Sequence, residues 1–153
     1  MEQIGADFAA AGLPVDLVED LIEARWRKLV WNIPFSGLTT LFQVDTAQIV
    51  NSMPMLTLVR DLMSEVLEGA SALGRTIPGS FLDKMITNTR EMRPYFPSMK
   101  LDFDAGKPLE LDAMYKKPID AAAAQGKRLT RIEMLYNELS FLQERNKKSP
   151  GHR

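Results

Sequence analysis

Three polar side chains recur four residues apart inside an apolar stretch, and these residues are the best suited in the chain to do chemistry. The stretch is WRKLVWNIPFSGL, residues 26–38, and its polar members are Lys28, Asn32 and Ser36. Side chains four apart lie on the same face of a helix, so an ammonium, a carboxamide and a hydroxyl would form a single polar row. Such a row facing a cleft could hold a small polar molecule.

Pro34 and Gly37 limit the helix that would carry this row. Proline inside a helix removes a backbone hydrogen bond and usually kinks or ends the helix. We therefore expect the helix to bend or stop between Asn32 and Gly37. The alternative to a binding site stays open at this point, because a lysine on an amphipathic helix is usually solvated and an asparagine near a proline is usually a cap or turn residue.

A second polar block, YFPSMKLDFDAGKPLELDAMY, spans residues 95–115. Ser98 stands beside a proline at the start of a short predicted helix, and an Ala-Gly turn follows. Glu110 and Asp112 then open another helix. Carboxylates are favoured at helix N-termini by the helix dipole, so helix-terminal charge is the ordinary interpretation of both.

Composition excludes several classes of function. The 153 residues fit one domain, and a formal net charge of -1 gives no general attraction to nucleic acid or to an anionic membrane. Zero cysteines exclude disulfides, thiolate nucleophiles and cysteine-type zinc sites. The single histidine, His152, lies in a polar tail, which argues against Ser-His-Asp chemistry and against a metal site. No apolar run approaches a membrane span and the acidic start lacks the basic flank of a signal peptide, so we expect a cytoplasmic protein.

Hydrophobic periodicity predicts an all-α chain, because no stretch alternates strictly between apolar and polar residues. We expect a single helical domain over residues 1–145 and a flexible polar tail over 146–153. Possible N-caps are Asp16, then Asp45 or Thr46, and Thr130 with Glu133 has the spacing of a capping box. The expected helices cover residues 1–12, the segment that carries the polar row, 54–73, 79–92, a short helix from 97, one from 110 that stops at Gly126, and 130–145.

Three blocks, WRKLVWNIPFSGL, FPSMKLDFDAGKPLELDAMY and RIEMLYNELSFL, occur in this order between residues 26 and 142, within a stretch of resemblance that runs from about residue 11 to about residue 142. Together they resemble the C-terminal domain of ketopantoate reductase (2-dehydropantoate 2-reductase), a helical domain of the 6-phosphogluconate dehydrogenase C-terminal-like type. The resemblance implies an NADP-dependent oxidoreductase of pantothenate biosynthesis, which reduces ketopantoate or a related 2-keto acid to the 2-hydroxy acid.

The resemblance also implies roles for individual residues. Lys28 would be the catalytic proton donor, and Glu110 would hydrogen-bond a substrate hydroxyl or the lysine. Asn32, Ser36 and Ser98 would bind the substrate, with Ser98 on its carboxylate. Many family members have asparagine where Ser36 stands, so the substrate stays open between ketopantoate and another branched 2-keto acid.

The family's Rossmann domain, which binds NADP, has no counterpart in this sequence. No segment places G-x-G-x-x-G between a strand and a helix. Alone, the chain should therefore be inactive, and its partners would be a 2-keto acid and the missing nucleotide-binding domain. An engineered or proteolysed fragment, a truncated gene product and a stand-alone domain with another role all stay open. The competing function is a helical dimerisation or interaction module without catalysis, in which long apolar helices pair with a second copy.

Overall fold

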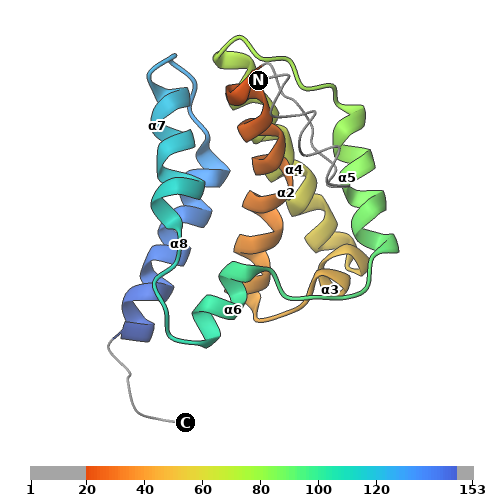
Figure 1. The fold of residues 1–153 in the computed structure, drawn as a ribbon, viewed down its shortest axis with the longest axis vertical. Coiled ribbons are helices and arrows are strands. Elements are labelled where there is room, and N and C mark those ends of the chain that lie inside the picture. The colour runs from red at the N-terminus through yellow and green to blue at the C-terminus, as the bar shows by residue number, and fades with distance from the viewer. Residues whose placement is uncertain (1–19, 148–153) are drawn as a thin grey trace, which may run out of the picture.

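The computed structural model describes residues 20–147, and this part of the chain is built of helices and contains no strand. The all-α prediction is therefore confirmed (Figure 1). The elements are α2 (Leu21–Phe42), α3 (Thr46–Asn51), α4 (Met53–Ala72), α5 (Ser80–Glu91), α6 (Ser98–Asp104), the π-helical segment η1 (Asp112–Lys116), α7 (Lys117–Ala123) and α8 (Thr130–Lys147). The predicted helix over 1–12, the Asp16 cap, His152 and the tail beyond residue 147 lie outside the described residues.

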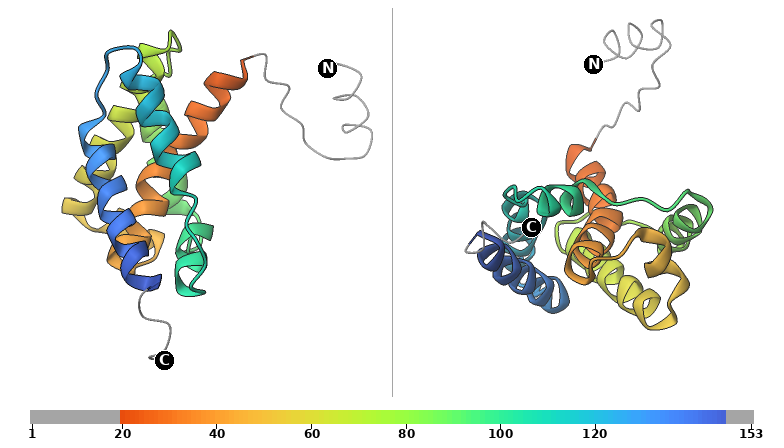
Figure 2. Two further views of the ribbon diagram at one scale, coloured as in Figure 1. Left: turned by 90° about the vertical axis from the view of Figure 1, so that its left-hand side faces the viewer. Right: turned by 90° about the horizontal axis from the view of Figure 1, so that it is seen from below.

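The central element is α2, which contacts α3, α4, α6, α8 and η1. In Figures 1 and 2, α7 and α8 lie together on one side of α2 and α4, whereas α3 and α5 lie on the other side. The short α6 packs at the end of the molecule where α2 finishes. No helix formed by residues 20–147 combines the length and the hydrophobicity needed to cross a membrane.

α2 does not stop at Pro34 or Gly37, so that part of the expectation is wrong. The helix continues to Phe42 and ends at Gln43, which has a left-handed φ of 58°. Every residue from 33 to 40 is buried, because neighbouring helices surround this half of α2. Tertiary packing therefore outweighs the poor helix propensity of proline and glycine.

Two glycines allow the helices to approach α2 closely. A Cβ at Gly69 of α4 would lie 2.5 Å from Cη2 of Trp26, and a Cβ at Gly37 would lie 2.5 Å from the Tyr115 hydroxyl oxygen and 2.8 Å from Cδ2 of Leu135. Any larger residue at either position would push the helices apart.

The other helix ends are partly as predicted. Asp45 caps α3 in a capping box with Gln48. The capping box expected from Thr130 and Glu133 is wrong, because the Glu133 N–H donates to the Leu129 carbonyl and the Glu133 carboxylate pairs with Arg128.

The N-terminus of α8 is instead capped by a buried carboxylate from another helix. Glu65 of α4 accepts hydrogen bonds from the backbone N–H groups of Arg131 and Ile132, at 2.9 Å and 3.0 Å to its Oε2. The guanidinium of Arg131 adds a contact at 3.3 Å. A helix leaves its first N–H groups unpaired, so this side chain satisfies donors that α8 cannot satisfy itself.

Candidate functional site

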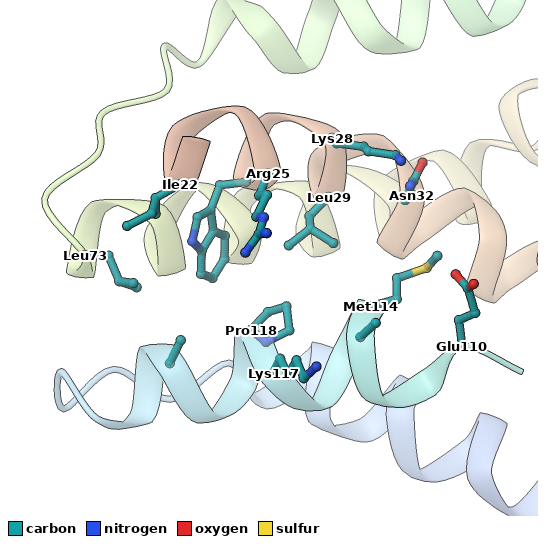
Figure 3. Close-up of a pocket in the computed structure, with 13 residues that line it drawn as sticks. Ile22, Arg25, Lys28, Leu29, Asn32, Leu73, Glu110, Met114, Lys117 and Pro118 are labelled. Atoms are coloured by element: carbon teal, nitrogen blue, oxygen red, sulfur yellow. The ribbon is translucent and has the colours of Figure 1, made fainter. Parts of the chain in front are cut away.

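One stripe of α2 faces a cavity between α2 and the η1–α7 segment. Its members recur at spacings of three and four residues, which places them on one face of the helix. The cavity has a volume of about 500 Å³ and its opposite wall comes from residues 110–121 (Figure 3). It is lined by Ile22, Arg25, Trp26, Lys28, Leu29, Asn32, Leu73, Glu110, Ala113, Met114, Lys117, Pro118 and Ala121.

The polar end of the cavity brings together three of the residues proposed from the sequence. Figure 3 shows the Lys28 ammonium beside the Asn32 carboxamide on α2, and the Glu110 carboxylate directed toward α2 from the other wall. None of these three side chains makes a hydrogen bond or an ion pair with another residue in the range 20–147. Their donors and acceptors are therefore available to a ligand.

The rest of the lining is largely apolar. Trp26, Leu29, Leu73, Met114 and Pro118 form it, and Trp26 is held in place by its packing on α4. An apolar cavity with a few convergent polar groups is the usual form of a small-molecule site, and about 500 Å³ lies in the usual range of volumes.

Ser36 and Ser98 do not line this cavity. Ser36 is only 3% exposed, because the second half of α2 is enclosed by other helices. The polar row therefore reaches the cavity at Lys28 and Asn32 and not at its third member. Ser98 is exposed at the first residue of α6, which packs against α2.

Sequence reasoning missed two cations on the cavity wall, Arg25 and Lys117. Arg25 could have been found, since it lies three residues before Lys28 and seven before Asn32, on the same helix face. Lys117 could not, because its wall is brought to α2 by tertiary packing.

A buried hydrogen bond joins the two walls. The Tyr115 hydroxyl of η1 donates to the Ile33 carbonyl of α2 at 2.8 Å, and the tyrosine is fully buried. Burial raises the pKa of Tyr115 far above its usual range, so the hydroxyl remains a donor at all ordinary pH values. This contact lies at the residue directly after Asn32 on α2 and five residues after Glu110, so it helps to set the separation of the two walls.

No group of three or more histidine, cysteine, aspartate or glutamate side chains among residues 20–147 is arranged to hold a metal ion.

Residues 20–143 match the family model described as the C-terminal part of ketopantoate reductase PanE/ApbA. The chain belongs to the ketopantoate reductase family. A 2-dehydropantoate 2-reductase from Nostoc sp. is 44% identical over 147 residues, which cover 96% of this chain and 46% of that protein.

Solved ketopantoate reductases share the fold. The chain aligns with the 2-dehydropantoate 2-reductase of Methylococcus capsulatus at a TM-score of 0.90 and 31% identity, covering 97% of this chain and 48% of the other. For the enzyme of Geobacter metallireducens GS-15 the TM-score is 0.88 and the identity 39%, with coverage of 92% and 47%. The chain thus spans about half the length of the ketopantoate reductases it matches, and it corresponds to their C-terminal domain.

Proposed function

We propose that this chain is the substrate-binding domain of an NADPH-dependent reductase that converts ketopantoate, or a related branched 2-keto acid, to the 2-hydroxy acid. The observation that carries the proposal is the meeting of Lys28, Asn32 and Glu110 at one cavity, without partners among the described residues. Membership of the ketopantoate reductase family supports the reaction class.

The cofactor requires protein beyond residues 20–147. A dinucleotide pyrophosphate is usually held at a glycine-rich turn between a strand and a helix, and these residues form no strand. The lining of the cavity does not supply such a turn. We therefore propose that a nucleotide-binding domain supplies the glycine-rich turn and completes the site.

The chain's own residues can perform the polar part of the reaction. The Lys28 ammonium donates a proton to the substrate's carbonyl oxygen as negative charge develops there, and it stabilises that charge before the transfer. The Asn32 carboxamide orients the substrate, and Glu110 accepts a hydrogen bond from a substrate hydroxyl or from Lys28. Ser98 does not line the cavity, so its carboxylate contact rests on the family resemblance alone, and the buried Ser36 is assigned no contact there.

Lys28 is exposed in this domain, so water has free access to the proposed proton donor. Electrostatic stabilisation of a developing oxyanion is far stronger when water is excluded. A second domain packed over the open side of the cavity would supply that exclusion, which explains in physical terms why the isolated chain should be inactive.

Titration of the ¹⁵N-labelled chain with ketopantoate tests substrate binding without requiring turnover. We expect the amide and side-chain signals of residues 25–32 and 110–118 to shift, and Lys28→Ala to weaken the binding. Lys84→Ala is the matched control, because Lys84 is an exposed lysine on α5 outside the cavity. Absence of shifts in the parent, or equal binding by the parent and Lys28→Ala, would contradict the proposal.

The second candidate, a dimerisation module, is favoured by apolar side chains on the outer face of α8. Met134 is 53% exposed and Phe141 is 64% exposed, and the two lie seven residues apart on the same side of the helix. Sedimentation equilibrium distinguishes the candidates: a dimer that Phe141→Glu dissociates would favour this function, whereas a monomer would exclude pairing of the isolated chain through α8.

A further inference from the structure

Arg25 points into the same cavity as the proposed substrate site, at the end away from Glu110. Figure 3 shows its guanidinium directed from α2 across the gap toward Pro118 of α7. Arg25 makes no hydrogen bond or ion pair with any residue in the described part of the chain. A guanidinium with five N–H donors is thus left facing an apolar cavity.

A second cation, Lys117, lines the same cavity from the opposite wall. It is held only by an ion pair of 3.5 Å with Asp112, in which both side chains are more than 70% exposed. Ion pairs of this kind contribute little and are easily exchanged for another partner.

The charges of the lining are unbalanced. It carries three cations, Arg25, Lys28 and Lys117, against one carboxylate, Glu110, although the whole chain has a net charge of -1. A single carboxylate on the ligand, placed near Lys28, would leave Arg25 without a counter-charge and Lys117 with only its exposed ion pair to Asp112.

We propose that Arg25 and Lys117 form a second anion-binding subsite, which takes a carboxylate or a phosphate at the end of the cavity opposite the 2-keto acid. The inference rests on the proposed function, since it takes the Lys28 end of the cavity as the place of the keto acid. Leu29 and Met114 lie between the two ends (Figure 3), and their apolar side chains suit a short run of methylene groups.

The anionic group has two chemical sources. It is either a second acidic group on the substrate itself or the phosphate next to the nicotinamide of the cofactor. Both present oxygen atoms that a guanidinium binds through paired hydrogen bonds.

The experiment measures dissociation constants of the chain, by NMR titration at low ionic strength, for three probes. 2-Oxoisovalerate is a branched monoacid, 2-oxoadipate is a 2-keto diacid, and nicotinamide mononucleotide carries the phosphate. The variants are Arg25→Gln, Lys117→Gln and Lys28→Ala. The controls are Arg90→Gln and Lys84→Gln, which remove exposed cations on α5 outside the cavity. Arg25→Lys tests whether the charge alone restores binding.

We expect 2-oxoadipate or nicotinamide mononucleotide to bind more tightly than 2-oxoisovalerate. Arg25→Gln and Lys117→Gln should each raise the dissociation constant of the tighter-binding probe about threefold to tenfold, because a partly exposed ion pair contributes only modestly to binding. The same variants should leave the dissociation constant of 2-oxoisovalerate unchanged. Added salt should reduce the preference of the chain for the probe with the second anionic group. The probe that responds identifies the source of the anionic group.

The outcomes separate the two proposals. If binding of 2-oxoisovalerate depends on Lys28 but binding of 2-oxoadipate and nicotinamide mononucleotide does not depend on Arg25 or Lys117, the subsite is wrong and the proposed function stands. If an anion binds through Arg25 while no keto acid depends on Lys28, the subsite stands and the proposed function fails. If no probe binds, or the α5 controls weaken binding equally, the subsite is overturned.

Discussion

The carboxyl group of Asp20 stabilises the central helix, α2, by capping its N-terminus. Its Oδ1 accepts the backbone N–H groups of Ile22 and Glu23 at the start of α2, and its Oδ2 lies 3.0 Å from Nε of Arg75. The Glu23 N–H first, and Arg75 next, hold the pKa of Asp20 below its ordinary value of 3.8. The folded state therefore favours the carboxylate. The resulting stabilisation is complete above about pH 3.8 and is lost as the pH falls through the folded-state pKa.

Asp20→Asn keeps an N-capping side chain and removes the titration. We expect the parent to be more stable than the variant at pH 6, and this advantage to shrink as the pH falls below about 3.8. Urea unfolding of both proteins between pH 6 and pH 2.5 measures the difference in their free energies of unfolding. The other carboxylates titrate in both proteins, so their contributions cancel in this difference. A difference that stays constant over this range would contradict the assignment.

Removing the Glu65 carboxylate should destabilise the fold, although Glu65 does not line the cavity. Glu65→Ala leaves the N–H groups of Arg131 and Ile132 without their acceptor, and the carboxylate side chain is only 7% exposed. We expect a loss of about 1–3 kcal/mol in the free energy of unfolding. Glu68→Ala, which removes an exposed ion pair with Lys127 on the same helix, should cost under about 1 kcal/mol. Equal losses in denaturant unfolding would show that Glu65 does not cap α8.

At the scale of elements, the contact of α2 with η1 depends on a glycine and a tyrosine. Gly37→Ala would place a methyl group 2.5 Å from the Tyr115 hydroxyl oxygen and 2.8 Å from Leu135. We expect a destabilisation of about 1–3 kcal/mol, as for other overpacked cores. Tyr115→Phe removes the nearer obstacle, so Gly37→Ala should cost less in that background. A double-mutant cycle of unfolding free energies measures this coupling, and strict additivity would contradict the close contact.

The ends of a helix could be predicted from the sequence where local residues determine them. They were predicted wrongly where tertiary packing determines them. Helix 54–73 could be recognised from its apolar spacing and a following glycine, and Gly74 does adopt a positive φ of 75°. The continuation of α2 through Pro34 could not, because it depends on the tertiary packing that buries residues 33–40. The cap of α8 could not either, since Glu65 lies 66 residues before Arg131.

The same division holds for the cavity. Lys28 and Asn32 share a helix face, so their spacing alone predicts that they lie together. Glu110 was placed with them only by the resemblance to ketopantoate reductase, and the structure puts it on the opposite wall. Ser36 has the right spacing but is buried, because periodicity specifies a helix face and not which other helices cover it.

At the scale of the molecule, the chain should not hold the cofactor by itself. Residues 20–147 form no strand and therefore no strand-turn-helix site for a pyrophosphate. We expect titration calorimetry of the chain with NADPH to show weak binding or none. Micromolar affinity would contradict this and would require a phosphate site of another kind.

Supplying a nucleotide-binding domain, by fusion to that of a related ketopantoate reductase, makes the role of Lys28 measurable. A proton donor that acts in the transition state contributes on the order of a hundredfold to ten-thousandfold, so Lys28→Ala should lower kcat by that range. Asn32→Ala should mainly raise KM, because an amide that orients the substrate acts in the ground state and the transition state alike.

Damage to the fold must be separated from loss of chemistry, since Lys28 shares α2 with the buried Trp26. The melting temperatures of both variants should match the parent within a few degrees, because Lys28 is exposed and makes no contact that holds α2 in place among the described residues. A folded Lys28→Ala protein that keeps more than about half of the parent kcat would remove Lys28 from proton transfer. The cavity would then be a binding site whose chemistry lies entirely in the other domain.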